Sequence, residues 1–272
     1  MWIYGKEIRE NIKQRLQAGF ARKDVALAVL QFGEQAASAA YVRGLTNFAR
    51  DVGVDFRHLT FPAAISEAEA ITEIDRLNRD AKVQGIMLQT PFPDHFDRER
   101  VINALDPNKD VEGIHSFNMG KLILAPDRAI VRPCTPSAVI TMLKANGVEL
   151  KGARVTVAGS SPIVGKPLAL LLNAEKATVT MCNSKTRDLG AETLRAEIVV
   201  AAIGKPGIIK PEMIAEGAVV IDVGTNFDAE GRMHGDVDPQ AEAKARLISA
   251  VPGGVGMITV AELYDNLDRM TD

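Results

Sequence analysis

Strand-type segments that alternate with helix-type segments constrain the fold of this chain more than any other sequence feature. The strand-type segments are 25–33, 55–61, 85–91, 153–159, 177–182, 197–204 and 218–224. Between them lie stretches whose apolar residues recur with helical spacing, such as 38–54. Strands that alternate with helices are typical of parallel βαβ units. The sequence therefore predicts an α/β protein with parallel sheets.

The alternation comes in two series, which predicts two lobes with a cleft between them. A loop-rich stretch, 105–120, separates the series, and 272 residues are comfortable for two domains. We predict an N-terminal α/β catalytic lobe over 1–136 and a C-terminal Rossmann-like lobe with a parallel sheet over 137–256. The glycine-rich stretch 251–258 reads as a linker that returns a final helix, 257–272, to the first lobe. A cleft between α/β lobes is a usual place for a small-molecule site.

Composition argues against several classes of partner. A net charge of −3 and 5% aromatic residues give no case for binding nucleic acid, and the charge gives none for an anionic membrane surface. No apolar run reaches the roughly 18 residues of a membrane span, and the N-terminus lacks the basic-then-apolar order of a signal peptide. Cys134 and Cys182 stand far apart without a CxxC motif or paired histidines. We therefore predict reduced thiols in a cytoplasmic protein without a metal site.

The stretch "VAGSSPIVGKPLALLL" (157–172) is the strongest local signal for a ligand. A strand ends at Gly159, small residues follow, and a helix begins near Gly165. Such a loop lets backbone N–H groups approach a phosphate at a helix N-terminus. The glycine spacing differs from GxGxxG, so a tight strand–helix turn is the alternative reading. The βαβαβ pattern behind the loop favours dinucleotide binding.

The end of the second strand of this lobe bears on the choice of dinucleotide. An NAD-binding lobe often carries an acidic residue there for the ribose 2′-hydroxyl. Here the sequence reads "MCNSKTR", with Ser184, Lys185 and Arg187 and no carboxylate. Hydroxyl and cationic groups suit a 2′-phosphate better, although a solvated turn would look the same.

Three further segments carry candidate residues. Gln89, in "MLQTPFP", stands at the carboxyl end of a strand, where open α/β sheets bind ligands. The loop "KDVEGIH" gathers Asp110, Glu112 and His115, which could be catalytic or a metal site. Two carboxylates and one histidine at this spacing favour no metal, and a solvated loop is the alternative. "VPGGVGMIT" (251–259) is rich enough in glycine for close backbone approach to a ligand or for a plain linker.

The helix predicted over 38–54 raises a question of its own. Tyr41 and Leu45 are one turn apart and share a face. The helix is either an ordinary core helix or a catalytic one on which Tyr41 works and Leu45 stands where an ionisable group is expected. The helix alone does not decide between these readings.

Taken together, these segments resemble the methylenetetrahydrofolate dehydrogenase/methenyltetrahydrofolate cyclohydrolase family. The motifs that carry the resemblance, in order, are "S..Y", "QTPFP", "KDVEG…N.G.L", "RPCTP", "G.S..VGKP", "ATVT.C.S.T", "AAIGKPG", "VIDVG", "GDVD" and "PGGVG". The resemblance covers nearly the whole chain. It implies two lobes, a folate held against the nicotinamide of NADP or NAD, commonly a homodimer, and hydride transfer from 5,10-methylenetetrahydrofolate. Many members then hydrolyse the methenyl product.

The resemblance also implies site residues. Tyr41, Gln89 and Glu112 match catalytic and folate-binding positions, and Pro252, Gly253 and Gly256 match further folate contacts. The positions that match cofactor contacts are Thr135, Gly159, Ser160, Ser161, Val164, Gly165, Ser184, Lys185, Ala202, Ile203 and Gly204.

Several departures from the family pattern affect the expected function. Leu45 occupies the position of the family's catalytic lysine, and Arg43 lies on a different side of the helix. Glu112 replaces an aspartate, Ser160 replaces an arginine often used for the 2′-phosphate, "CHS" reads "CNS", and "GPMT" reads "GMIT". The expected preference for NADP is therefore weaker than in typical relatives, but NADP remains favoured over NAD because no acidic residue of the NAD type is present.

We therefore expect an NAD(P)-dependent methylenetetrahydrofolate dehydrogenase whose cyclohydrolase activity is lost or weak. The alternatives are a paralogue that acts on another folate-like substrate and a catalytically silent protein that binds folate or a partner. The intact cofactor motifs argue against the silent protein.

Overall fold

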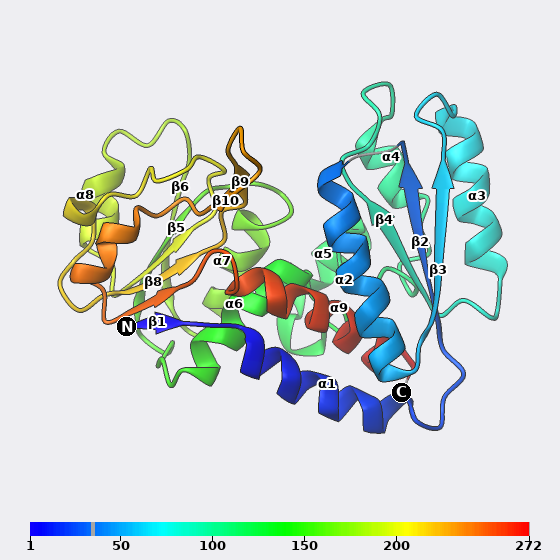
Figure 1. The fold of residues 1–272 in the computed structure, drawn as a ribbon, viewed down its shortest axis with the longest axis horizontal. Coiled ribbons are helices and arrows are strands. Elements are labelled where there is room, and N and C mark those ends of the chain that lie inside the picture. The colour runs from blue at the N-terminus through cyan, green and yellow to red at the C-terminus, as the bar shows by residue number, and fades with distance from the viewer. Residues whose placement is uncertain (34–35, 272) are drawn as a thin grey trace. The chain divides into compact units, whose positions relative to one another are not determined.

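The structure, a computed structural model, describes residues 1–33 and 36–271; the side chains of residues 34–38 lie outside this description, and with them the Ser38 side chain of the "S..Y" motif. The chain forms two compact units (Figure 1). The six-stranded unit comprises Met1–Arg9 and Thr135–Thr259, and the three-stranded unit comprises Glu10–Cys134 and Val260–Asp272. The predicted α/β class with parallel sheets is confirmed in both units.

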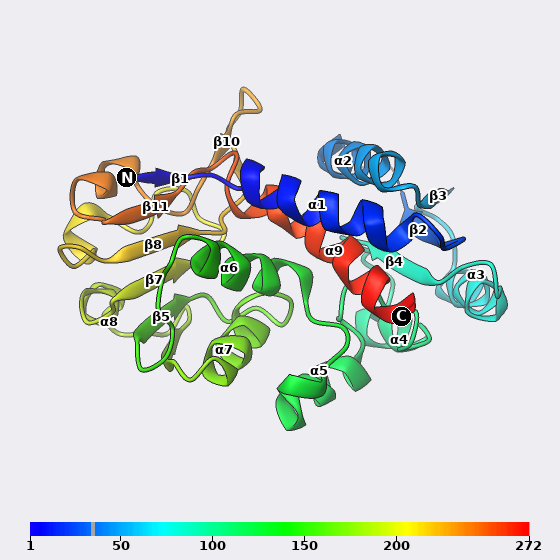
Figure 2. The same cartoon turned by 90° about the horizontal axis from the view of Figure 1, so that it is seen from below.

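The six-stranded unit is built on a parallel sheet, several strands of which lie side by side in Figure 2. Its strands, in spatial order, are β1 (Trp2–Ile3), β11 (Leu247–Ser249), β8 (Val219–Asp222), β7 (Ile198–Ala201), β5 (Arg154–Ala158) and β6 (Thr178–Cys182). The helices are α6 (Cys134–Ala145), which begins at the unit boundary, α7 (Gly165–Ala174) and α8 (Leu189–Leu194), with short 3-10 turns at Pro211–Met213 and Pro239–Ala243. An antiparallel hairpin, β9 (Asn226–Phe227) and β10 (Met233–His234), follows β8.

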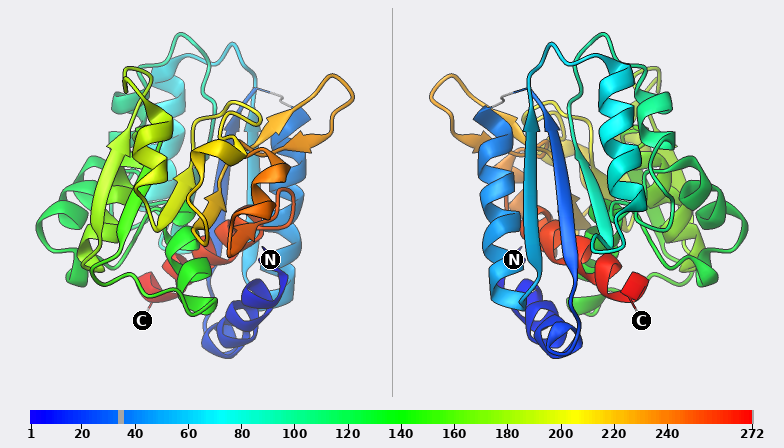
Figure 3. Two further views of the ribbon diagram at one scale, coloured as in Figure 1. Left: turned by 90° about the vertical axis from the view of Figure 1, so that its left-hand side faces the viewer. Right: turned by 90° about the vertical axis from the view of Figure 1, so that its right-hand side faces the viewer.

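The three-stranded unit has the parallel order β3 (Asp55–Phe61), β2 (Ala26–Phe32) and β4 (Gly85–Gln89). Figure 3 shows this sheet between helix α2 (Ala36–Val52) and helix α3 (Glu67–Arg79). Alternate residues of β2 and β4 pack on opposite faces, as the pleat requires. The other helices are α1 (Lys6–Phe20), α4 (Arg98–Asn103), α5 (Ser116–Leu124), the 3-10 turn Pro126–Arg128 and α9 (Val255–Thr271); α1 and α9 each begin in the six-stranded unit.

Local sequence signals account for these elements. Ser66 caps α3: its hydroxyl accepts a hydrogen bond from the Glu69 N–H, and the Glu69 carboxylate accepts one from the Ser66 N–H. A serine and a glutamate three residues apart at a helix start are the sequence pattern of a capping box, and this reciprocal pair forms it. The helix then buries Ala70, Ile74 and Leu77, which recur at helical spacing.

The structure differs from the sequence analysis in three places. Strand β1 pairs with β11, so the first nine residues belong to the six-stranded unit and not, as expected, to the lobe over 1–136. The stretch 105–120 is not all loop, since α5 begins at Ser116, where the His115 Nδ1 accepts from the Phe117 N–H. The expected linker 251–258 is shorter, because α9 begins at Val255.

None of the helices in the described part of the chain combines the length and the apolar character needed to cross a lipid bilayer.

Candidate active site

Tyr41, Glu112 and Cys134 form an electrostatic cluster in the three-stranded unit. Burial is the main cause that raises the pKa of the Tyr41 phenol, and Glu112 and Cys134 raise it further. Burial also raises the pKa of Glu112, to about 8; Asp110 adds to this rise and Arg98 opposes it. Such perturbed groups are typical of functional sites. The structure thus brings together two of the three predicted catalytic side chains, Tyr41 and Glu112.

Gln89, the third of them, is the last residue of β4 and is 7% exposed. Its Nε2 donates to the Thr90 carbonyl at 2.8 Å, and Gln31 is its register partner on β2. Met87, two residues earlier on the same strand, belongs to the core cluster that contains Leu45 and that Tyr41 packs against. Because residues i and i+2 of a strand share a face, Gln89 lies on the face of the sheet that this cluster covers.

The loop that carries Glu112 is organised by Asp110. The Asp110 carboxylate accepts hydrogen bonds from the backbone N–H groups of Glu112, Gly113 and His115 and from the Asn118 side chain. The main chain beside Asp110 pairs with Ile86, so the loop runs parallel to β4. Asp110 and His115, both catalytic candidates in the sequence, therefore serve here as a loop anchor and a helix cap.

Leu45 is completely buried in the core of the three-stranded unit. It belongs to one apolar cluster with Phe48 and Tyr264, whose rings stack at 5.0 Å. The Tyr264 hydroxyl donates to the Leu45 carbonyl at 2.9 Å. Leu45, which the resemblance aligns with a family lysine, is thus part of the apolar packing of α2.

In the six-stranded unit, Gly159 and Gly165 bring three backbone segments into close approach. A Cβ at Gly159, whose φ is +132°, would overlap the Ala202 carbonyl, and a Cβ at Gly165 would overlap the Gly159 carbonyl. The strand end, the start of α7 and the residue after β7 can meet only because both positions are glycine. A glycine loop that leads into a helix is a common phosphate-binding arrangement in α/β proteins.

The side chains of this loop are placed as follows. The Ser161 hydroxyl accepts from the N–H groups of Val164 and Gly165 at 3.2 and 3.4 Å, so it shapes the loop as well as being a candidate phosphate contact. Ser184 and Lys185 are exposed in the turn after β6, where the Lys185 N–H donates to Asn183 Oδ1. The remaining predicted cofactor residues in this unit are Ser160 in the loop after β5, Thr135 in the first turn of α6, and Ala202, Ile203 and Gly204 after β7.

Of the predicted folate contacts, Pro252 and Gly253 lie in the turn before α9 and Gly256 lies in its first turn, all three in the six-stranded unit. The Gly253 carbonyl accepts a hydrogen bond from the Gly5 N–H at 2.8 Å, and the backbone φ of Gly253 is +103°. Apart from its chain neighbours and the backbone of its own helix, no described atom would lie within 4 Å of a Cβ at Gly256.

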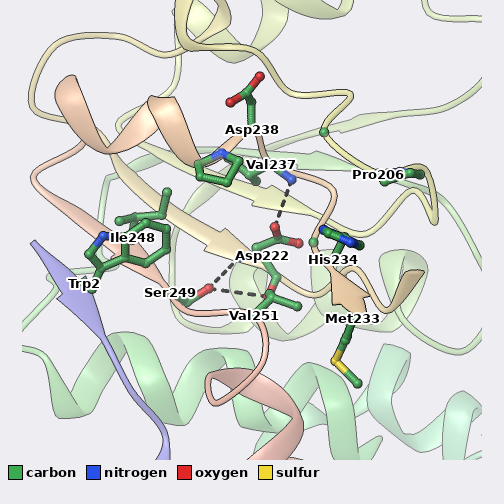
Figure 4. Close-up of a pocket in the computed structure, with 13 residues that line it drawn as sticks. Trp2, Pro206, Asp222, Met233, His234, Val237, Asp238, Ile248, Ser249 and Val251 are labelled. Carbon is green, nitrogen blue, oxygen red and sulfur yellow. Dashed lines mark hydrogen bonds between the residues drawn. The ribbon is translucent and has the colours of Figure 1, made fainter. Parts of the chain in front are cut away.

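Two carboxylates outside the predicted site, Asp222 and Asp236, are buried in the six-stranded unit, with 4% and 0% of their surface exposed. Burial raises the pKa of Asp222 to about 6 despite hydrogen bonds from backbone N–H groups, so it is mainly a carboxylate at pH 7. A pocket of about 290 Å³ opens beside it, lined partly by Trp2, Ile248 and Val251 (Figure 4). The only sequence signal for the pair is an acidic residue near a glycine in "VIDVG" and "GDVD".

Across residues 1–33 and 36–271, no three His, Cys, Asp or Glu side chains are grouped as a metal site would require. Both cysteines are buried free thiols.

Comparisons with known proteins connect both units to one family. Two family models match: the tetrahydrofolate dehydrogenase/cyclohydrolase catalytic domain over residues 3–112 and the NAD(P)-binding domain of the same enzymes over residues 133–271. The bifunctional protein FolD 2 of Syntrophomonas wolfei is 49% identical over 98% of this chain and 97% of its own length.

Solved structures agree with these matches. The bifunctional FolD of Campylobacter jejuni is 33% identical, with a TM-score of 0.95 over 99% of this chain and 98% of that one. The Trypanosoma brucei methylenetetrahydrofolate dehydrogenase-cyclohydrolase, solved with NADP and an inhibitor, is also 33% identical, with a TM-score of 0.93 over 99% and 96%. The chain therefore belongs to the tetrahydrofolate dehydrogenase/cyclohydrolase family.

Proposed function

We propose that this protein oxidises 5,10-methylenetetrahydrofolate to 5,10-methenyltetrahydrofolate with NADP⁺, or less readily NAD⁺, and that it hydrolyses the methenyl product poorly or not at all. The observation that supports weak or absent hydrolysis is the identity of residue 45. Leu45 is apolar and fully buried, and it lies one helical turn from Tyr41. The proposal makes the two activities of the family separable in this chain.

The residues of the six-stranded unit fit a dinucleotide. Gly159 and Gly165 form a cradle that a Cβ would fill, at the start of α7. Bound NAD(P)⁺ supplies the acceptor for the hydride. Ser161 and the N–H groups of the loop would hold the phosphates, while Ser184 and Lys185 would lie near the adenosine ribose. We place Thr135, Ser160, Val164, Ala202, Ile203 and Gly204 in the remaining cofactor contacts.

The three-stranded unit supplies the folate-binding side chains. We propose that Gln89 hydrogen-bonds the pterin and that Glu112 accepts hydrogen bonds from the pterin's amino edge. Tyr41, whose raised pKa keeps the phenol protonated at neutral pH, would position the folate as a donor. Pro252, Gly253 and Gly256 would add backbone contacts.

Hydride transfer and hydrolysis make different demands on these residues. For hydride transfer the protein must align the reacting carbon with the nicotinamide and exclude water, and no side chain needs to take up a proton. Hydrolysis of the methenyl group requires water to add and protons to move, which calls for a positioned acid or base. A lysine with a lowered pKa can do this work and leucine cannot. Losing such a group costs about 10²–10⁴-fold in rate.

The test is an assay of initial rates with 5,10-methylenetetrahydrofolate and either cofactor, followed by the absorbance of the reduced nicotinamide. Reduction with NADP⁺ supports the proposal. Absence of reduction with both cofactors would favour a silent folate-binding or partner-binding protein, and reduction only with another folate-like substrate would favour a paralogue.

Glu112 gives a prediction about pH. If the pterin binds the ionised carboxylate, tetrahydrofolate affinity should rise about tenfold per pH unit from pH 6 towards pH 8 and then level off, since the pKa of Glu112 is about 8. Glu112→Gln should make this profile flat and weaken folate binding far more than NADP binding. Calorimetry under argon measures both ligands, and equal losses for the two would contradict the assignment.

The stability of the same variant serves as its control. Because burial raises the pKa of Glu112 from 4.5 to about 8, the folded protein holds this proton more tightly than the unfolded chain does. The contribution of Glu112 to the free energy of unfolding therefore falls as pH rises from about 4.5 to 8. Glu112→Gln should thus be at least as stable as the parent at pH 9, and a loss of folate binding there cannot be attributed to unfolding.

We also propose that the protein acts as a cytoplasmic homodimer. The two buried free thiols fit a reducing compartment. Sedimentation equilibrium of the purified chain measures its oligomeric state, and a monomer at micromolar concentration would contradict the dimer.

A further inference from the structure

Asp236 fixes the segment that follows β7. Its Oδ2 accepts hydrogen bonds from the N–H groups of Ile203 and Gly204 at 2.5 and 2.9 Å, and its Oδ1 accepts from the Lys205 N–H at 2.9 Å. The Asn226 side chain donates to the same Oδ1 at 2.9 Å. A completely buried carboxylate thus holds three consecutive N–H groups of a chain segment more than 30 residues away in sequence.

Asp222 in turn holds Asp236 in place. The Asp222 carboxylate accepts from the N–H groups of Gly224, Asp236 and Val237 at 2.8 to 2.9 Å. The Asp222 N–H donates to the Ser249 hydroxyl at 2.7 Å; Figure 4 shows the bonds to Ser249 and Val237. These contacts form a chain of hydrogen bonds from β11 through β8 to the segment after β7.

Glycines allow the two carboxylates to come this close to the backbone. A Cβ at Gly235 would overlap the Asp222 carboxylate, and a Cβ at Gly224 would overlap the backbone nitrogen of Asp236. The turn at 235–237 is therefore packed against Asp222 without room for adjustment, and the position of Asp236 is fixed by sterics as well as by hydrogen bonds.

The segment that Asp236 holds borders the dinucleotide cradle. The Ala202 carbonyl lies where a Cβ of Gly159 would be, and the Ala202 N–H donates to the Ala158 carbonyl at 2.8 Å. A shift of residues 203–205 would therefore be transmitted to the backbone beside Gly159. Both carboxylate oxygens of Asp236 accept hydrogen bonds from N–H groups of the protein. Any effect of Asp236 on a bound dinucleotide is therefore transmitted through residues 203–205.

We propose that Asp236 is a positioning residue for the dinucleotide: its carboxylate sets the path of residues 203–205 and so the shape of the cofactor site. This inference rests on the proposed function, because it assumes that the cradle binds NAD(P). Asp236→Asn keeps the size of the side chain but turns an NH₂ group towards backbone donors. Buried groups left unpaired in this way are costly, so the segment moves.

The direct test is the binding of NADPH, followed by its fluorescence, to the full-length protein and to Asp236→Asn. The variant should bind about tenfold or more weakly, and the KM for NADP⁺ should rise while the KM for methylenetetrahydrofolate stays unchanged. Asp238→Asn is the matched control: Asp238 is two residues away and bonds Lys210 and the Gln240 N–H instead of residues 203–205. It should bind NADPH like the parent.

A milder variant keeps the test informative if Asp236→Asn does not fold. Asn226→Ala removes one hydrogen bond to Asp236 and should weaken NADPH binding about threefold, again without a change in the folate KM. Unchanged NADPH affinity in a folded variant, or equal losses for both substrates, would overturn the positioning role. A parent protein that binds neither NADPH nor NADH would instead refute the proposed function, which separates the two failures.

Discussion

Gly165→Ala should abolish useful dinucleotide binding. A single methyl group at this position overlaps the Gly159 carbonyl, so the start of α7 must move away from the end of β5. A misplacement of about 1 Å in a catalytic site can cost roughly 100-fold in rate. Because the same displacement breaks contacts between the loop and the dinucleotide, we expect NADPH affinity, measured by calorimetry, to fall by a comparable factor of about 100.

A control from the same unit accompanies this variant. Gly190 lies in α8, and a Cβ there would meet its nearest neighbours, Asp188 and Met213, at 3.4 Å, which is an ordinary contact. Gly190→Ala should bind NADPH normally. Undiminished NADPH affinity in Gly165→Ala would show that the cofactor does not use this cradle.

The second large effect concerns position 45. Leu45→Lys should restore measurable hydrolysis of methenyltetrahydrofolate, because it returns an amine to the helix one turn from Tyr41. The gain in the rate of hydrolysis should not exceed the roughly 10²–10⁴-fold that a general acid or base contributes to a rate. The decay of methenyltetrahydrofolate absorbance above the uncatalysed rate measures it.

The substitution Leu45→Lys should also lower the stability of the protein. Leu45 is fully buried beside Phe48 and Tyr264, so a lysine there must become neutral or disturb the packing. We expect a loss of roughly 2–4 kcal/mol in the free energy of unfolding. Leu45→Met, which has a similar volume and no amine, should lose less than about 1.5 kcal/mol and gain no hydrolysis. Equal hydrolysis by the two variants would show that the amine is not the missing group.

The sequence predicts the elements that have a strong period and clear ends. The strand over Ala26–Phe32 and the helix that Ser66 caps each carry their own local signal, a largely apolar run and a capping box. Strand β1 was missed since two residues cannot show a period, and it forms only by pairing with β11, far along the chain. Helix α5 begins within the stretch 105–120, whose loop-type residues, Gly113, Asn118 and Gly120 among them, conceal its start.

Some residues of the candidate site can likewise be predicted from local sequence patterns, and others cannot. Gln89 could be anticipated because the carboxyl end of a parallel strand is a usual ligand position, and Glu112 because the motif around it is specific. The proposed role of Asp236 could not be anticipated, because it depends on hydrogen bonds from Ile203–Lys205. No local sequence pattern connects Asp236 to that segment. The burial of Leu45 follows from helical spacing, but its stacked neighbour Tyr264 comes from the other end of the chain.

The separation of the two activities is tested most directly by product stoichiometry in a single reaction of the unmodified protein with methylenetetrahydrofolate and NADP⁺. We predict that methenyltetrahydrofolate accumulates in step with reduced cofactor and then decays at the uncatalysed rate. Rapid formation of 10-formyltetrahydrofolate, with little methenyl intermediate at any time, would contradict the account, because it would mean that hydrolysis proceeds without a lysine at position 45.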